Sequence, residues 1–326
     1  MCFLGGACHQ GLFLFSSLYS RKSGNAYKKR LIPKLEAGDP FSGWILNIQV
    51  GRISFRPNPS ANLAGVKKGG LPLKPIQVGL WGFGKTGRLV ANEFLNDKRF
   101  DLSWVVRKST ADHHKYASRL LGQECDTGEI ISIEDIGPSF FREHPVDVLV
   151  DFSSSRGVHA YQHAAEEGIP IVSAISQYEK EDLALLESLA QKTPVLYSPN
   201  ITLGINVLLI AAQILQKIAP HADIEVVEEH FKKKPEISGT AKKIAKLLQL
   251  DDEHVNSIRV GGIVGRHEII FGMPNQTIRL SHESISRASF GQGAIFAANF
   301  LVKQPPGLYS MEGIIADMFR DNIPVY

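Results

Sequence analysis

One stretch decides the fold of this chain: Ile76-Gln77-Val78-Gly79-Leu80-Trp81-Gly82-Phe83-Gly84-Lys85-Thr86-Gly87. Its first half is apolar enough for a buried strand, and residues 88–95 have the apolar spacing of a helix. Strand, G-x-G-x-x-G turn and helix, in this order, form the fingerprint of dinucleotide binding. Glycines also mark plain turns, but the flanking strand and helix favour a nucleotide site. The predicted cofactor-binding loop comprises Gly82, Phe83, Gly84, Lys85, Thr86 and Gly87.

The end of the next expected strand, 100–106, bears on the choice of cofactor. Arg107 and Lys108 follow it directly. An acidic residue here accepts hydrogen bonds from the ribose 2′-hydroxyl of NAD, whereas a basic residue suits the 2′-phosphate of NADP. Arg107 offers a bidentate fork and Lys108 a point charge. The sequence therefore predicts NADPH as the preferred cofactor and leaves NADH open; two solvated loop cations are the alternative.

From Ile76 onward, strand patterns alternate with helical ones. Further strands are expected at 146–152, 169–173 and 194–197, and helices at 160–167 and 180–191. This alternation predicts the α/β class, with a Rossmann-type doubly wound parallel sheet whose ligands bind at the carboxyl ends of the strands.

After Asn200 the pattern changes. A long apolar helix is expected at 206–218, and short strands follow at 223–227, 258–262, 268–273 and 277–284. Short runs of this kind are typical of an antiparallel or mixed sheet. A helical pattern returns from Gly293 to Val302, and 307–311 leads into a last short helix. We expect a dinucleotide-binding domain at 74–200 plus 287–326 and an inserted α+β domain at 201–286.

A second informative stretch is 228–241, which places His230, a run of lysines and a Ser-Gly-Thr turn ahead of a helical pattern. That pattern consists of Ala241, Ile244, Ala245 and Leu248. Ser238 or Thr240 is the expected N-cap. The free backbone N–H groups of Gly239 and Thr240 would then face a carboxylate. The stretch predicts an anion site beside a proton donor, and a solvated basic loop is the alternative.

Composition limits the function classes. Hydrophobic residues make up 44% and charged residues 21% of 326 residues, as in a soluble globular protein. The formal charge of +3 is too small to argue for nucleic acid, and no apolar run reaches the roughly 18 residues of a membrane span. Three cysteines, Cys2, Cys8 and Cys125, have neither metal-ligand nor disulfide-framework spacing, so no metal is expected and a reducing compartment is favoured.

The segment 1–73 differs from the rest. It is poor in acidic residues, rich in Ser, Gly, Lys and Arg, and without sustained periodicity. An unassigned extension of this kind fits a disordered basic arm, a transit peptide or an over-extended reading frame. We give it no catalytic role. The expected location is the cytoplasm, or the plastid if the segment is a transit peptide.

From about Ile76 to Asp321 the chain resembles the 4-hydroxy-tetrahydrodipicolinate reductase (dihydrodipicolinate reductase) family. The stretches that carry the resemblance are 82–88, 148–152, 200–206, 229–241, 262–267, 286–290 and 293–311. The resemblance implies a Rossmann domain, a smaller domain for substrate binding and tetramerisation, and NAD(P)H-dependent reduction of 4-hydroxy-tetrahydrodipicolinate to tetrahydrodipicolinate in diaminopimelate and lysine biosynthesis. It also implies a small dicarboxylate substrate and a homotetramer, with no nucleic-acid or membrane partner.

The resemblance also implies roles for single residues. His230 matches a proton donor/acceptor and Lys234 the proton-donor lysine, while the carboxylate-binding turn is matched by Ser238, Gly239 and Thr240. A cofactor segment is matched by Ser173, Ala174 and Ile175, and a hinge segment near the nicotinamide by Ser198, Pro199, Asn200 and Ile201. Second-rank candidates are Arg259, His267 and Arg287.

Three departures from the family pattern keep alternatives open. Phe231 stands where the family has a second histidine, the loop from Lys234 to Ser238 is one residue shorter, and Ser173-Ala174-Ile175-Ser176 replaces Gly-Thr-Thr-Gly. An inactive or regulatory NADPH-binding paralogue, or a reductase of another small dicarboxylate, fits the same sequence.

Overall fold

The structure is a computed structural model of the full chain, and it describes residues 44–49, 52–57, 74–110 and 112–324. Strands β1 (Trp44–Gln49) and β2 (Arg52–Pro57) pair in a two-stranded sheet inside the segment 1–73. The two larger sheets both belong to the compact unit Ile45–Tyr326.

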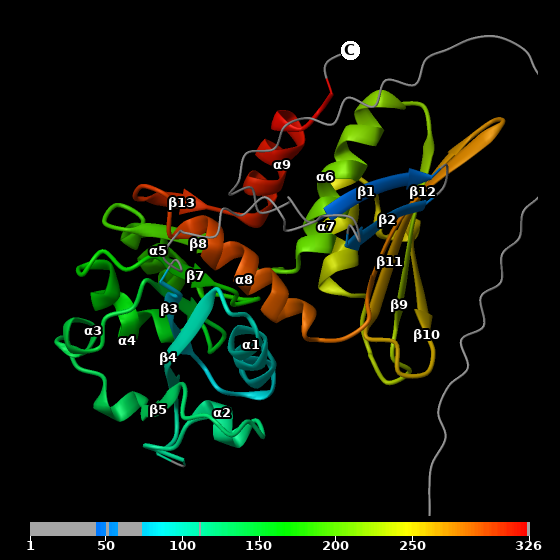
Figure 1. Ribbon diagram of the computed structural model, residues 1–326. Helices are drawn as coiled ribbons and strands as arrows, with labels where there is room; N and C mark the ends of the chain where they lie inside the picture. Colours follow the sequence, from blue (N-terminus) through cyan, green and yellow to red (C-terminus); the bar gives the residue numbers. More distant parts are fainter. Residues whose placement is uncertain (1–43, 50–51, 58–73, 111, 325–326) are drawn as a thin grey trace, which may run out of the picture. The chain divides into compact units, whose positions relative to one another are not determined.

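The larger sheet has seven parallel strands in the order β13-β8-β7-β6-β3-β4-β5 (Figure 1). Its strands are β3 (Ile76–Trp81), β4 (Phe100–Arg107), β5 (Glu129–Ser132), β6 (Val148–Asp151), β7 (Ile171–Ser173), β8 (Pro194–Tyr197) and β13 (Gly307–Tyr309). Strands β6 and β7 are buried throughout, as expected for parallel strands covered on both faces. The strand order reverses between β3 and β6, where such sheets bind their ligands.

Helices cover both faces of this sheet. Val148 and Val150 of β6 pack into one core with α1 (Lys85–Asn96), α8 (Ser289–Leu301) and α9 (Met311–Asp321). Leu149 points the other way, into a core with α3 (Phe140–Glu143), α4 (Gly157–Tyr161) and α5 (Lys180–Leu189). A further short helix, α2 (Ala117–Leu120), precedes β5. The alternation along β6 thus builds a three-layer α/β architecture.

The second sheet is mixed, with the order β10-β9-β11-β12. Its strands are β9 (Asp223–His230), β10 (Val255–Arg259), β11 (Gly265–Met273) and β12 (Gln276–Ser284). Strand β10 runs parallel to β9, whereas the other pairs are antiparallel. Ile224 and Val226 of β9 share a core with α6 (Leu203–Ile218) and α7 (Gly239–Leu248). Glu228 and His230 continue the same buried face of β9, so polar side chains end an apolar row.

These observations confirm the predicted fold class and correct several boundaries. The helix expected at 206–218 starts at Leu203, and the one expected at 160–167 starts at Gly157 and becomes a 3₁₀ turn at Gln162. Strand β9 extends to His230, and residues 307–309 form an edge strand before the last helix. Strand β5 was not predicted, because four residues are too few to show a period. The domain boundaries stay predictions.

Within the described ranges, no helix combines the length and apolarity that crossing a membrane requires.

Candidate functional site

The glycine loop after β3 has the geometry of a dinucleotide cradle. Gly82 adopts a φ of +105°, and a Cβ there would lie 2.8 Å from the Phe152 carbonyl. A Cβ on Gly87 would lie 2.0 Å from the Gly82 oxygen, whereas one on Gly84 would meet nothing within 4 Å. The first and last glycines therefore shape the turn, and the middle one leaves its outer side open. Gly84 caps α1 without a side-chain hydrogen bond, so the first N–H groups of the helix stay available to an anion.

The side chains of this loop divide between core and solvent. Phe83 is buried in the core beside α1, while Lys85 is exposed and Thr86 half-buried. The Gly82 N–H donates to the Val106 carbonyl at 2.8 Å, which places the loop beside the end of β4. The residues present therefore fit a dinucleotide held mainly by backbone groups.

The two basic residues after β4, Arg107 and Lys108, differ in their contacts. Lys108 is exposed, but the Arg107 guanidinium donates to Asp112 at 2.6 Å. Asp112 also accepts from Lys115 at 2.9 Å, and hydrogen bonds from Lys115 and then Arg107 lower its pKa. Asp112 adopts a φ of 63°, which is uncommon outside glycine. The sequence reasoning missed this carboxylate five residues beyond Arg107.

The other predicted cofactor segments lie after β7 and β8. Ser173 and Ser198 have no exposed surface, and the Ser198 N–H donates to the Ser173 carbonyl at 3.0 Å. Ile175 and Ile201 are also buried, whereas Ala174 and Asn200 are partly exposed and Pro199 is exposed. Contacts from these segments to a ligand would therefore come mostly from backbone atoms and from Asn200.

A buried carboxylate lies at the carboxyl end of β6. Asp151 Oδ1 accepts from the Ser153 hydroxyl at 2.6 Å, and Oδ2 accepts from the Tyr161 hydroxyl at 2.9 Å. Tyr178 extends the network, since its hydroxyl lies 2.8 Å from the Ser173 hydroxyl. Burial raises the pKa of Asp151 to about 6, although hydrogen bonds from Ser153 and Tyr161 counteract it. No charged partner contacts this carboxylate among the described residues.

The second sheet carries the predicted anion site. Of the two N-cap candidates, Ser238 is the cap of α7: its hydroxyl accepts from the Ala241 N–H at 3.0 Å. The N–H groups of Gly239 and Thr240 have no acceptor within the part of the chain that the structure describes. His267 Nε2 lies 2.9 Å from the Ser238 hydroxyl, and burial lowers the pKa of His267 to about 3. A neutral histidine thus supports the cap while the helix N-terminus stays open.

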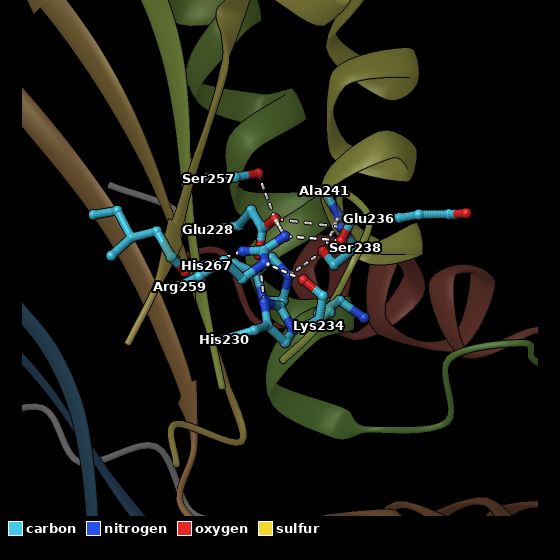
Figure 2. A network of polar contacts seen from close by, with 10 residues as sticks. Glu228, His230, Lys234, Glu236, Ser238, Ala241, Ser257, Arg259 and His267 are labelled. Atoms are coloured by element: carbon cyan, nitrogen blue, oxygen red, sulfur yellow. Dashed lines mark hydrogen bonds and ion pairs between the residues drawn. The ribbon is translucent and has the colours of Figure 1, made fainter. Parts of the chain in front are cut away.

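His230 belongs to a polar network that joins β9, β10 and the loop before α7 (Figure 2). Its Nδ1 bonds to Glu228 Oε2. The other oxygen, Oε1, accepts from the Ser257 hydroxyl and the Arg259 guanidinium, both at 2.6 Å. Burial raises the pKa of Glu228, but hydrogen bonds from Arg259, Ser257 and His230 outweigh it and lower the pKa to about 2. Burial also lowers the pKa of His230, against the opposing effect of Glu228.

Lys234 lies in the turn between β9 and α7. Its N–H donates to the Phe231 carbonyl at 3.0 Å, and its carbonyl accepts from Arg259 Nε at 3.1 Å. Lys234 is half-buried, and its ammonium group has no hydrogen-bond or ion-pair partner among the described residues. Lys232 and Lys233 are exposed. The backbone of Lys234 is therefore held through both its N–H and its carbonyl group, and the loop presents the side-chain amine of this residue.

A cavity of about 100 Å³ is lined by several of the predicted site residues. Its walls include His230, Thr240, Asn200, Gly265 and His267. The Asn200 amide donates to the Thr240 hydroxyl at 3.2 Å, so a predicted hinge residue contacts a predicted substrate residue. Lys234, Ser238 and Gly239 are not among the lining residues, and Arg287 is exposed just before α8. No group of three or more His, Cys, Asp or Glu side chains suited to a metal ion occurs in the ranges that the structure describes.

Glu228 and Ser257 received no role from the sequence. A signal for Glu228 was present, because the period of two along β9 places it on the buried face with His230. Nothing local indicates Ser257, which reaches Glu228 only through the pairing of β10 with β9.

Comparisons with known proteins agree with this geometry. The family described as "Dihydrodipicolinate reductase, N-terminus" matches residues 76–201, and "Dihydrodipicolinate reductase, C-terminus" matches 204–315. The 4-hydroxy-tetrahydrodipicolinate reductase of Syntrophus aciditrophicus is 30% identical over 271 residues, 74% of this chain and 98% of the relative. That of Caldanaerobacter subterraneus subsp. tengcongensis is 37% identical over 192 residues, 52% of this chain and 76% of the relative.

Among solved structures, a dipicolinate-bound dihydrodipicolinate reductase from Paenisporosarcina sp. TG-14 has the same fold. The TM-score is 0.60 at 21% identity, and the match covers 74% of this chain and 99% of the other.

The chain joins a glycine loop on a doubly wound sheet to a mixed sheet with an open helix N-terminus. With the family match, these features define the class: a dinucleotide-binding oxidoreductase. Within that class, the chain belongs to the dihydrodipicolinate reductase family.

Proposed function

We propose that the chain catalyses the NAD(P)H-dependent reduction of 4-hydroxy-tetrahydrodipicolinate to tetrahydrodipicolinate, in diaminopimelate and lysine biosynthesis. One observation carries the proposal beyond family membership: the free N–H groups of Gly239 and Thr240 open the positive end of α7 in the same short segment as Lys234 and His230. A small dicarboxylate suits this combination of an anion site with two titratable groups. Charge-assisted hydrogen bonds to its carboxylates contribute on the order of 1.5–3 kcal/mol each.

Lys234 and the α7 N-terminus hold the substrate. The Gly239 and Thr240 N–H groups bind one carboxylate, and the Lys234 ammonium binds near the carboxylate or the ring nitrogen. Because the α7 cap is fixed by Ser238 and His267, the N–H groups of Gly239 and Thr240 do not need to reorganise when the substrate arrives.

His230 is proposed to act in the loss of water. Its lowered pKa keeps the ring neutral near pH 7, and Glu228 occupies Nδ1, so Nε2 is the free acceptor. A neutral imidazole accepts a proton from the ring carbon next to the hydroxyl-bearing carbon and returns it to the departing hydroxyl, which leaves as water. We assign His230 this role and not that of a general acid, because a depressed pKa disfavours the charged donor form.

The conjugated imine formed by that step is then reduced. The reduced nicotinamide cofactor, when bound, supplies the hydride that adds at carbon. Lys234 donates the accompanying proton, so the net reaction consumes one proton and releases one water. Positioned proton transfer of this kind contributes roughly 10²–10⁴-fold to the rate.

We also propose NADPH as the preferred cofactor, with Arg107 and Lys108 at the 2′-phosphate. The ion pair with Asp112 reduces the charge that Arg107 presents, which makes NADH a second substrate rather than an excluded one. The homotetramer, the cytoplasmic location and the absence of a role for 1–73 stay predictions.

The test is an NADPH-oxidation assay at 340 nm, with substrate produced in place by the preceding synthase and NADH in a parallel arm. We expect oxidation that depends on the substrate. Cofactor binding without any oxidation would instead support a regulatory paralogue, in which Phe231 and the shortened loop have removed the activity. Oxidation with other small dicarboxylates alone would assign a different substrate.

A further inference from the structure

Glu228 is the most highly connected buried side chain of the second sheet, and the proposed mechanism uses only its contact with His230 Nδ1. Its side chain has no exposed surface. Oε2 bonds to His230 Nδ1, while Oε1 accepts from Ser257, from Arg259 and, at 3.4 Å, from the Ser238 N–H. These donors come from β9, β10 and the residue that caps α7. This carboxylate therefore links the strand of His230 to β10 and to the N-terminus of α7.

We propose that Glu228 is the positioning residue of the site: it fixes the tautomer of His230 and, with Arg259 as its internal counter-ion, holds the Lys234 loop against the α7 N-terminus. The inference rests on the proposed function and deepens it. Glu228 does not contact the substrate in this account.

The tautomer follows from hydrogen-bond chemistry. An ionised carboxylate only accepts, so the His230 nitrogen that bonds to it must carry the hydrogen. The neutral ring then has a bare Nε2. A Cβ on Gly265 would lie 3.0 Å from this Nε2, and both residues line the cavity. Glu228 therefore directs the proton-accepting nitrogen of His230 toward the cavity wall.

The loop is held through Arg259. Its Nη2 donates to Glu228 and, at 2.8 Å, to the Glu236 carbonyl, and its Nε donates to the Lys234 carbonyl at 3.1 Å. Nη1 bonds to the Ile258 carbonyl at 3.0 Å. All three guanidinium nitrogens thus bind groups of this chain. Arg259, a second-rank candidate from the sequence, therefore holds the shortened loop in place and does not bind the substrate.

The principal variant is Glu228→Gln. A glutamine has the same size, but one side of its amide donates, so it cannot accept from all four partners at once. We expect kcat to fall by roughly 10²–10⁴-fold, the range for a misdirected acid–base group, with KM for NADPH nearly unchanged. The acid limb of the kcat profile should move to lower pH, because Glu228 is the only negative group facing His230 among the described residues. The positive or titratable groups that face it are Arg259 from β10, Lys234 from the loop and His267 from β11.

The matched control is Glu225→Gln, on the same strand. Glu225 Oε1 lies 2.9 Å from His254 Nδ1, in a pair that is about half exposed (44% and 47%). Removing this pair should leave kcat within about twofold, because exposed ion pairs contribute little. The control therefore distinguishes the effect of losing the buried Glu228–His230 contact from the effect of losing any Glu–His contact made by β9.

A double-mutant cycle tests whether Glu228 acts through His230. In a His230→Gln background, Glu228→Gln should lower kcat by less than about threefold further. An equally large loss in both backgrounds would overturn the action through His230, and a Glu228→Gln enzyme no slower than the Glu225→Gln control would overturn the positioning role as a whole.

The ¹⁵N NMR signals of the His230 ring in the unmodified protein provide a readout independent of activity and of any variant's folding. We expect the Nδ1–H tautomer at pH 7; the Nε2–H tautomer would overturn the inference. If the tautomer is as expected but no reductase activity is found, the proposed function fails and the assignment of the Glu228–His230 pair remains.

Discussion

Two buried carboxylates, one in each large sheet, behave in opposite ways. Asp151 ends β6 and pairs with Trp81, the last residue of β3 before the glycine loop, and Glu228 lies near the end of β9; neither has exposed surface. Burial raises the pKa of Asp151 to about 6. Burial acts in the same direction on Glu228, but hydrogen bonds led by that from Arg259 lower its pKa to about 2. Charged partners lower the pKa of Glu228 against the effect of burial, whereas the hydroxyl partners of Asp151 offset that effect only in part.

This difference separates the two regions by function. Around Asp151 the partners are hydroxyl groups, and the glycine loop offers backbone N–H groups to an anion. Around Glu228 the partners are an imidazole and a guanidinium, and a free amine lies on the neighbouring loop. We infer that the first region holds the cofactor and the second moves protons. Variants in one region should therefore leave the other region's function unchanged.

The largest expected effect comes from Lys234→Ala. Loss of the proton donor should lower kcat by about 10²–10⁴-fold, while the Kd for NADPH stays within about twofold. Steady-state kinetics and calorimetric titration measure the two quantities. Lys233→Ala, an exposed neighbour in the same turn, is the control and should change kcat little. Equal losses in both variants would assign the effect to general charge.

The pH dependence of stability should have opposite signs at the two carboxylates. The pKa of Asp151 is higher in the folded chain than its ordinary value of 3.8, so its stabilising neutral form is lost as pH rises through about 6. At 1.36 kcal/mol per pKa unit this amounts to about 3 kcal/mol. The pKa of Glu228 is lower than its ordinary 4.5, so its contribution is present above pH 4.5 and lost as pH falls toward 2.

Urea unfolding from pH 3 to 7 measures this contrast. Asp151→Asn should gain stability relative to the unmodified protein as pH rises from 4 to 7. Glu228→Gln should be least stable, relative to the unmodified protein, above pH 5 and should approach it in acid. Parallel stability curves for the two variants would contradict the comparison.

Within the glycine loop, two substitutions should differ in whether they lower the stability of the free protein. Gly84→Ala has room for its methyl group in the free protein, so Tm should stay unchanged while NADPH binds about tenfold more weakly, a loss near 1.4 kcal/mol. Gly87→Ala collides with the Gly82 carbonyl and should lower Tm as well. Calorimetric titration and thermal melting distinguish them. A Gly84→Ala protein with unchanged NADPH affinity would argue against close approach of the pyrophosphate at this position.

The smallest expected effect concerns the choice of cofactor. Asp112→Asn removes the carboxylate that pairs with Arg107, so the guanidinium is free for a 2′-phosphate. The ratio of NADPH to NADH affinity should rise by about two- to fivefold. Asp126→Asn, which breaks the exposed pair with Arg119, is the control and should leave the ratio unchanged. A ratio that falls in Asp112→Asn would place Arg107 away from the 2′-position.

The contrast between regions also explains what the sequence could predict. The glycine loop and the Ser238 cap depend on residues within a few positions of one another, so their patterns are visible locally. Glu228 reaches Arg259 across 31 positions, and Ser238 reaches His267 across 29. The first contact requires the register in which Arg259 pairs with His230 across β10 and β9, and the second the register in which His267 pairs with Glu228 across β11 and β9. Such a register is set by the packing of whole strands, which no short pattern encodes.

A structure of the protein with NADP⁺ and pyridine-2,6-dicarboxylate, a planar mimic of the substrate, tests the central claim most directly. We predict one carboxylate of the mimic within hydrogen-bond distance of the Gly239 and Thr240 N–H groups, with Lys234 Nζ and His230 Nε2 facing the ring. A mimic bound elsewhere, or one contacted by Arg259 in place of Lys234, would contradict the account.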